Sequence, residues 1–267
     1  MTKKISLKNK QGERIVALWD VPSGIKPPFP AIILCHGFKG YKEQLHLRTL
    51  AQALVSRGFV VLRPDFTDGV GESDGLLEDV RFSKELTDLG SVVDYLVKQK
   101  NIDPKRIGLS GHSLGGQLIF HYAPSDRRIK ALAGLAGSYV RGRGMTSLEK
   151  NALSQASEAK KSGYFHIESK RTRKKHQIKI GFYYDLLRHD TLKEAKKITI
   201  PVLLLHGTAD NSVRIESSKK IYQAVKGPKQ LVLIKGAPHT WRGKADPGGK
   251  FQKMINPVVV DWFSKNL

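Results

Sequence analysis

The chain has 267 residues, of which 40% are hydrophobic and 26% charged, and its formal net charge is +22. The single cysteine, Cys35, excludes an internal disulfide framework and any metal site built from several cysteines. No apolar run reaches the roughly 18–20 residues of a membrane-spanning helix, and the lysines near the amino terminus are followed by no apolar stretch typical of a secretory signal, so we expect a cytoplasmic globular protein.

Strand-like and helix-like runs alternate along the chain, which is typical of a parallel sheet covered by helices. Apolar runs predict strands at residues 14–19, 31–36, 59–63, 106–110, 129–135, 200–206 and 230–234. Helices are predicted around residues 43–57, 78–98, 114–123, 217–225 and 251–263. Asp103-Pro104 predicts a turn before the strand at 106–110. We therefore expect an α/β fold with a mostly parallel central sheet flanked by helices.

Residues 139–197 interrupt this alternation. The stretch contains no predicted buried strand, is helix-prone and carries the basic run Lys170–Lys175. We interpret it as an inserted, basic, helical lid, and residues 1–138 and 198–267 as the core domain. Three aromatic side chains are candidates to line a substrate pocket or, equally, to form the lid's own core: Tyr164, Phe182 and Tyr183.

The candidate nucleophile is Ser113, in the motif Gly111-His112-Ser113-Leu114-Gly115. This Gly-x-Ser-x-Gly pattern lies directly after a predicted strand and directly before a predicted helix, the context that the nucleophile turn of a serine hydrolase requires. The turn is tight and strained, so neighbouring side chains must be nearly absent.

A serine hydroxyl needs a base, and nine histidines are available. His239 is the best candidate because it follows the strand at 230–234, at the sheet edge where the sites of α/β proteins gather. His36 and His112 flank the catalytic turns and are expected to be structural, and His206 ends a strand and is expected to be buried and hydrogen-bonded. Asp210 follows the strand at 200–206 and is the candidate carboxylate for orienting His239.

Two backbone N–H groups are candidates for an oxyanion hole. The first is that of Leu114, the residue after the nucleophile. The second is that of Phe38, in the turn after the strand at 31–36, where Gly37 permits a close backbone approach.

The order Ser113, Asp210, His239 and the two glycine turns together resemble the α/β-hydrolase superfamily. The resemblance covers nearly the whole chain from Arg14 to the last helix. It implies the α/β-hydrolase fold and, at the position after His-Gly, an oxyanion donor that corresponds to Phe38.

The loop from Arg63 to Gly75 sharpens this resemblance. It is similar to a loop of small esterases related to cinnamoyl (feruloyl) esterases, except that Asp68 stands where a glycine is usual and one extra residue precedes Gly71. Those esterases carry an inserted lid at the place of residues 139–197 here.

These residues predict a serine hydrolase that cleaves carboxylic esters through an acyl-enzyme. No metal and no organic cofactor is expected. The same triad attacks amides and thioesters, so a serine peptidase and a thioesterase remain alternatives, as does a non-catalytic binding module on a hydrolase scaffold.

The formal net charge of +22 limits which binding partners can be expected. An excess of 46 Lys and Arg over 24 Asp and Glu attracts anions without specificity. No nucleic-acid motif is present, so we expect a small-molecule ester as the partner and no specific nucleic acid. Binding of nucleic acid or an anionic membrane through the basic lid is a third alternative, and the sequence leaves the oligomeric state open, a homodimer included.

Overall fold

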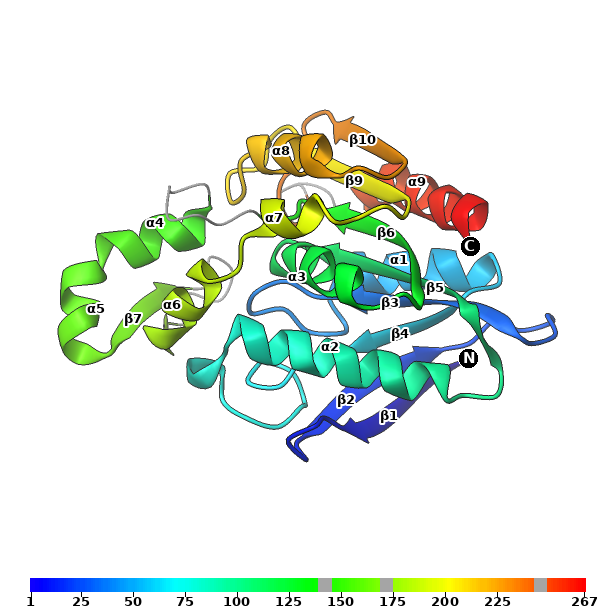
Figure 1. Cartoon of the computed structure of the whole chain (residues 1–267), viewed down its shortest axis with the longest axis horizontal. Helices are drawn as coiled ribbons and strands as arrows, with labels where there is room; N and C mark the ends of the chain where they lie inside the picture. The colour runs from blue at the N-terminus through cyan, green and yellow to red at the C-terminus, as the bar shows by residue number, and fades with distance from the viewer. Residues whose placement is uncertain (139–145, 169–174, 243–248) are drawn as a thin grey trace.

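The central β-sheet is mostly parallel. The computed structural model describes residues 1–138, 146–168, 175–242 and 249–267. Within these residues, eight strands form one sheet in the order β1-β2-β4-β3-β5-β6-β9-β10 (Figure 1). The strands are Thr2–Lys8 (β1), Arg14–Asp20 (β2), Phe29–Cys35 (β3), Val60–Pro64 (β4), Ile102–His112 (β5), Ile129–Leu135 (β6), Val202–Gly207 (β9) and Lys229–Ile234 (β10). The β1–β2 and β2–β4 pairs are antiparallel, and every pair from β4 to β10 is parallel.

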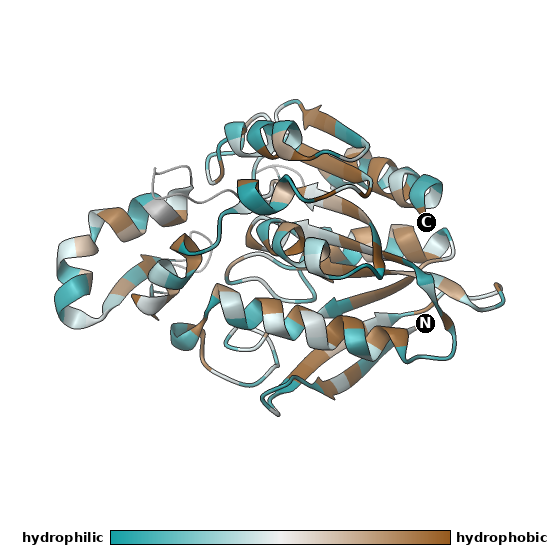
Figure 2. Cartoon of the chain, viewed as in Figure 1, coloured by the Kyte–Doolittle hydropathy of each residue, from teal (hydrophilic) through white to brown (hydrophobic). Residues whose placement is uncertain are grey.

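Helices cover both faces because the buried strands are apolar on both sides. In β3, Ile33 packs into one apolar cluster while Ile32 and Leu34 pack into the other. Helices α1 (Leu45–Ser56) and α9 (Lys250–Asn266) cover one face, and α2 (Phe82–Val97), α3 (Leu114–Tyr122) and α8 (Glu216–Ala224) cover the other. Figure 2 shows the hydrophobic residues concentrated in the strands between these layers. The predicted α/β fold is confirmed.

Two predictions about the first half of the chain fail. Strand β1 was not predicted, because three of its seven residues are lysines and most of the strand is exposed, so it lacks an apolar run. The turn predicted at Asp103-Pro104 is wrong, because both residues lie within β5. The ladder to β3 jumps there from Phe29–Ile102 to Ala31–Ile107, and such an irregularity accommodates a proline that has no N–H to donate.

Much of the segment between β6 and β9 projects beyond the sheet (Figure 1, left). Its elements are α4 (Ser147–Ser154), α5 (Ala156–Ser162), β7 (Tyr164–Glu168), β8 (Lys175–Lys179), α6 (Gly181–Leu187) and α7 (Thr191–Ala195). The expectation of a stretch without a buried strand is wrong. β7 and β8 form an antiparallel pair in which Phe165 lies opposite Ile178, and both side chains are fully buried. Residues 170–174 of the basic run lie outside the described residues.

Two 3-10 turns, η1 (Leu77–Asp79) and η2 (Ala123–Ser125), complete the described elements. None of the helices in the described part of the chain is both long and apolar enough to span a bilayer.

Candidate active site

Ser113 occupies the strained turn that the motif predicted. It stands between the end of β5 and the start of α3, with φ 56° and ψ −116°, a conformation that L-residues adopt only when their surroundings enforce it. The surrounding glycines are required for space. A Cβ on Gly111 would lie 2.1 Å from the carbonyl oxygen of Gly115, and one on Gly115 would lie 2.4 Å from that of His36.

Asp210 and His239 meet at the carboxyl edge of the sheet. The Nδ1 atom of His239 lies 2.7 Å from Oδ2 of Asp210, whose side chain is 1% exposed. Burial raises the pKa of Asp210, but hydrogen bonds from His206, His239 and the Val213 N–H outweigh it and hold this pKa below its usual range. The carboxylate is therefore charged, and it can fix the His239 tautomer that leaves Nε2 free to accept a proton.

Backbone hydrogen bonds join the loops that carry these two residues. The N–H of Thr208 donates to the carbonyl of Ile234, and the N–H of Ala209 donates to that of Ala237. The Thr208 hydroxyl accepts from the N–H of Gly236 at 2.8 Å. The loops after β9 and β10 thus form one unit, which sets the Asp210–His239 distance.

His112 links this unit to the nucleophile. Its Nε2 lies 2.8 Å from the backbone carbonyl oxygen of His239, and the two rings are 4.7 Å apart. A carbonyl can only accept, so Nε2 of His112 carries the proton. Burial, together with His46 and His239, lowers the pKa of His112 well below its ordinary value, so the ring is neutral. Among the described residues, no hydrogen bond joins the Ser113 hydroxyl to His239, and the contact between their segments runs through His112.

The two candidate oxyanion donors flank Ser113. Gly37 approaches it so closely that an added Cβ would lie 3.0 Å from Cβ of Ser113. In the described part of the chain, neither the N–H of Phe38 nor that of Leu114 donates a hydrogen bond, so both are available to a ligand. His36 stabilises the Phe38 turn: its Nδ1–H donates to the Gly37 carbonyl at 3.0 Å, and its Nε2 accepts from the N–H of Phe66.

The aromatic residues predicted as substrate contacts occupy different surroundings. Phe182, on α6, is fully buried and stacks on Phe38 with ring centroids 5.0 Å apart. Tyr183 is buried, and Tyr164 is half-buried in β7. Phe182 thus brings the segment between β6 and β9 onto the turn that carries Phe38.

In the Arg63–Gly75 loop, Asp68 stands where a glycine is usual in the similar esterases, and its backbone conformation is one that favours glycine. Asp68 has φ 55°, the left-handed region in which glycine is favoured. Its carboxylate receives a hydrogen bond from Lys84 at 2.7 Å, which compensates part of the strain. Lys42, buried beneath the same loop, donates to Asp65 at 2.6 Å and also to Glu72.

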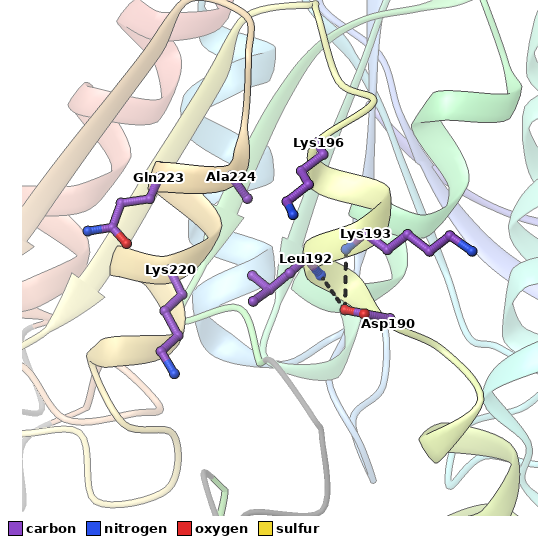
Figure 3. A pocket seen from close by; sticks show the side chains of 7 residues that line it. All are labelled: Asp190, Leu192, Lys193, Lys196, Lys220, Gln223 and Ala224. Atoms are coloured by element: carbon purple, nitrogen blue, oxygen red, sulfur yellow. Dashed lines mark hydrogen bonds between the residues drawn. The ribbon is translucent and has the colours of Figure 1, made fainter.

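A separate groove lies between α7 and α8 and contains none of the predicted site residues. Figure 3 shows Lys193, Lys196 and Lys220 around it, and the Asp190 carboxylate accepts from the N–H groups of Leu192 and Lys193. Among the described residues, no group of three or more His, Cys, Asp and Glu side chains is arranged to hold a metal ion.

The sequence did not predict that two further histidines, His206 and His112, contact the triad candidates. His206 was expected to be buried and hydrogen-bonded, and it is, but its Nε2 also lies 3.3 Å from Oδ2 of Asp210. His112 was expected to be structural, and its bond to the His239 carbonyl joins segments 127 residues apart. Only the His-Gly-x-x-Asp spacing from 206 to 210 hinted at the first of these contacts.

Comparison with known proteins identifies the family. A family model described as "Serine aminopeptidase, S33" matches residues 26–243. A protein of Escherichia coli, described as an uncharacterized 31.7 kDa protein in the traX-finO intergenic region, is 30% identical over 97% of this chain and 98% of its own length. The mitochondrial palmitoyl-protein thioesterase ABHD10 of Bos taurus is 28% identical over 83% of this chain and 71% of its own.

Solved structures share the fold. Est1E from Butyrivibrio proteoclasticus, with ferulic acid bound, has a TM-score of 0.78 at 24% identity, and the match covers 98% of each chain. The matched residues 26–243 include Ser113, Asp210 and His239. The chain therefore belongs to the serine aminopeptidase S33 family, within the α/β-hydrolase superfamily of serine hydrolases.

Proposed function

We propose that this protein is a carboxylic-ester hydrolase in which Ser113 is the nucleophile, His239 the general base and Asp210 the partner of that base. The observation that carries the proposal is the 2.7 Å contact between Asp210 and His239, held by joined loops on the sheet edge where Ser113 stands. Nucleophilic acyl transfer requires an oriented imidazole that can reach a serine hydroxyl.

The chemical steps follow from these positions. His239 removes the proton of Ser113 as its oxygen attacks the ester carbonyl, and the N–H groups of Phe38 and Leu114 stabilise the oxyanion. His239 then protonates the leaving alcohol. Water repeats the cycle on the acyl-enzyme and releases the acid. Residues 139–197 act as a lid in this proposal, with Phe182 and Tyr183 shaping the acyl side of the site.

Thioester cleavage is the second candidate, because a relative with 28% identity is named a palmitoyl-protein thioesterase. The same serine, base and oxyanion donors serve both reactions, since only the leaving group differs. Acyl preference and leaving-group preference therefore have to be measured together.

The test is a substrate panel run beside Ser113→Ala. We expect p-nitrophenyl esters to be hydrolysed, and Ser113→Ala to lose at least about 10³-fold in kcat. Matched S-acyl thioesters and aminoacyl anilides measure the thioesterase and peptidase alternatives. A fluorophosphonate should label the starting protein and not Ser113→Ala.

Ser110→Ala is the matched control. Ser110 is buried in β5, three residues before the nucleophile, and its hydroxyl has no hydrogen-bond partner among the described residues. This variant should keep its activity. Ester hydrolysis retained by Ser113→Ala at the starting rate would contradict the proposal, and a preference for thioesters or anilides would replace its substrate class.

A further inference from the structure

A second histidine contacts the carboxylate of the proposed triad. His206, at the end of β9, is fully buried, and its Nε2 lies 3.3 Å from Oδ2 of Asp210, the oxygen that His239 also contacts. The described site thus places two imidazoles on one carboxylate oxygen. The mechanism of acyl transfer uses only one of them.

The other contacts of His206 determine its tautomer. Nε2 also lies 3.1 Å from the Val213 carbonyl oxygen, which can only accept, so Nε2 carries the proton. Nδ1 must then accept, and the hydroxyl of Ser218 on α8 supplies the donor at 2.7 Å. The Nε2–H therefore donates to the Val213 carbonyl, and Oδ2 of Asp210 is a second contact of the same nitrogen at 3.3 Å.

The remaining oxygen of Asp210 is equally constrained. Oδ1 accepts from the N–H groups of Ser212 and Val213 at 2.8 Å each. Val213 thus binds the carboxylate through its N–H and His206 through its carbonyl. A rotation of the carboxylate would break contacts on both oxygens.

We propose that His206 is a positioning residue of the triad, which through the chain Ser218–His206–Asp210 holds the carboxylate plane toward His239 and shares its negative charge. The inference rests on the proposed function, since it requires that His239 be the base. His206 is fully buried, so it acts without touching substrate.

The proposal predicts the direction of a pH effect. The Nε2–H of His206 withdraws charge from Asp210. Without it, the carboxylate interacts more strongly with His239 and favours the protonated imidazole, so the acid limb of the kcat/KM profile moves to higher pH. The other titratable groups near the pair are His112 from β5 and His46 from α1, both neutral because burial lowers their pKa, and the nearby Arg214 and Glu216 are exposed to solvent.

The experiment compares His206→Leu, which removes the donor, with His206→Gln, which keeps an N–H at similar reach. We expect His206→Leu to lose about 10- to 100-fold in kcat/KM, almost entirely in kcat, as expected for a hydrogen bond to a charged group. Its acid limb should rise by about half a pH unit. His206→Gln should restore most of both properties.

Two further variants complete the experiment, one that weakens the same hydrogen-bond chain and one control. Ser218→Ala removes only the hydroxyl that fixes the His206 tautomer, and it should shift the acid limb in the same direction by a smaller amount. His121→Leu removes a partly buried histidine of α3 that contacts Thr191 and none of the triad candidates, so it should leave the limb in place. If His206→Leu does not fold, Ser218→Ala and His206→Gln decide the outcome.

A spectroscopic measurement separates this inference from the proposed function. The hydrogen-bonded Nδ1–H of His239 should give a low-field proton resonance that moves in His206→Leu and returns in His206→Gln. Retention of activity by Ser113→Ala would overturn the proposed function, while the resonance would still report on His206. If Ser113→Ala is inactive but His206→Leu and Ser218→Ala leave both the acid limb and the resonance unmoved, the inference alone is overturned.

Discussion

At the scale of single residues, the candidate site depends on places where no side chain fits. The turn that carries Ser113 passes within contact distance of the turn that carries Phe38, and Gly115 is the residue between them. An added Cβ on Gly115 would lie 2.4 Å from the His36 carbonyl and 2.5 Å from that of Cys35. Both obstacles are backbone atoms, which cannot rotate away as a side chain can.

We therefore predict that Gly115→Ala destabilises the fold and displaces the turn that carries Phe38. The expected losses are about 2 kcal/mol or more in unfolding free energy and at least tenfold in kcat. Gly137→Ala is the matched control, because its Cβ would meet Gly116 at an ordinary 3.6 Å. Chemical denaturation and ester hydrolysis measure both effects, and equal stability of the two variants would refute the account.

The candidate triad could be predicted from the sequence because each member follows a recognisable apolar strand. Ser113, Asp210 and His239 come directly after such strands or in the loops that follow them. The partners of these residues could not be predicted in the same way. The contact of His112 with the His239 carbonyl depends on how two loops meet in space, and no spacing in the chain encodes it.

At the scale of elements, the segment between β6 and β9 is joined to the core through α6. Phe182 stacks on Phe38, and the Asp185 carboxylate accepts from the N–H of Ser83 at the start of α2. The sequence predicted an inserted segment here because the apolar strands stop. It did not reveal the β7–β8 hairpin, because each strand is only five residues long and lies within a basic, polar stretch.

The ring stack yields a prediction about this junction. Phe182→Ala should lower the unfolding free energy by about 3 kcal/mol, because a fully buried aromatic is removed, and should reduce kcat because Phe38 loses its support. Tyr184→Ala, two residues along α6 at a side chain that is 43% exposed, should change stability by about 0.5 kcal/mol or less. Thermal melts and kinetics of the two variants provide the measurement. Similar losses in both would show that the stack contributes nothing specific.

At the scale of the whole molecule, the burial of individual acidic residues affects the pH dependence of stability as much as their number does. Acidic side chains are scarce, and several are paired inside the protein, as Asp20 is with Arg63 and Asp65 with Lys42. The excess of Lys and Arg could be read from the sequence. The sequence could not predict that Glu85, on α2, is buried and forms no ion pair with any described residue, because helical periodicity alone does not separate a buried glutamate from a solvated one.

Glu85 should make global stability depend on pH. Its side chain is buried, and its Oε2 has no hydrogen-bond partner among the described residues. Burial, with Asp88 and Asp68 nearby, raises its pKa to about 8. Between about pH 4.5 and 8 the folded protein keeps a proton that the unfolded chain has released, so this group's contribution to stability is present at low pH and is lost as the pH rises through this window.

Glu85→Gln removes this titration, because an amide does not ionise. The variant should therefore gain stability relative to the starting protein as the pH rises from 4.5 to 8.5, by up to about 4 kcal/mol, on top of any constant cost of burying the amide. Glu216→Gln on α8, where the side chain is 50% exposed, is the control and should give a curve parallel to that of the starting protein. Urea denaturation across this pH range measures the unfolding free energy of each protein. If the difference between Glu85→Gln and the starting protein stays constant with pH, Glu85 is already ionised in the folded state.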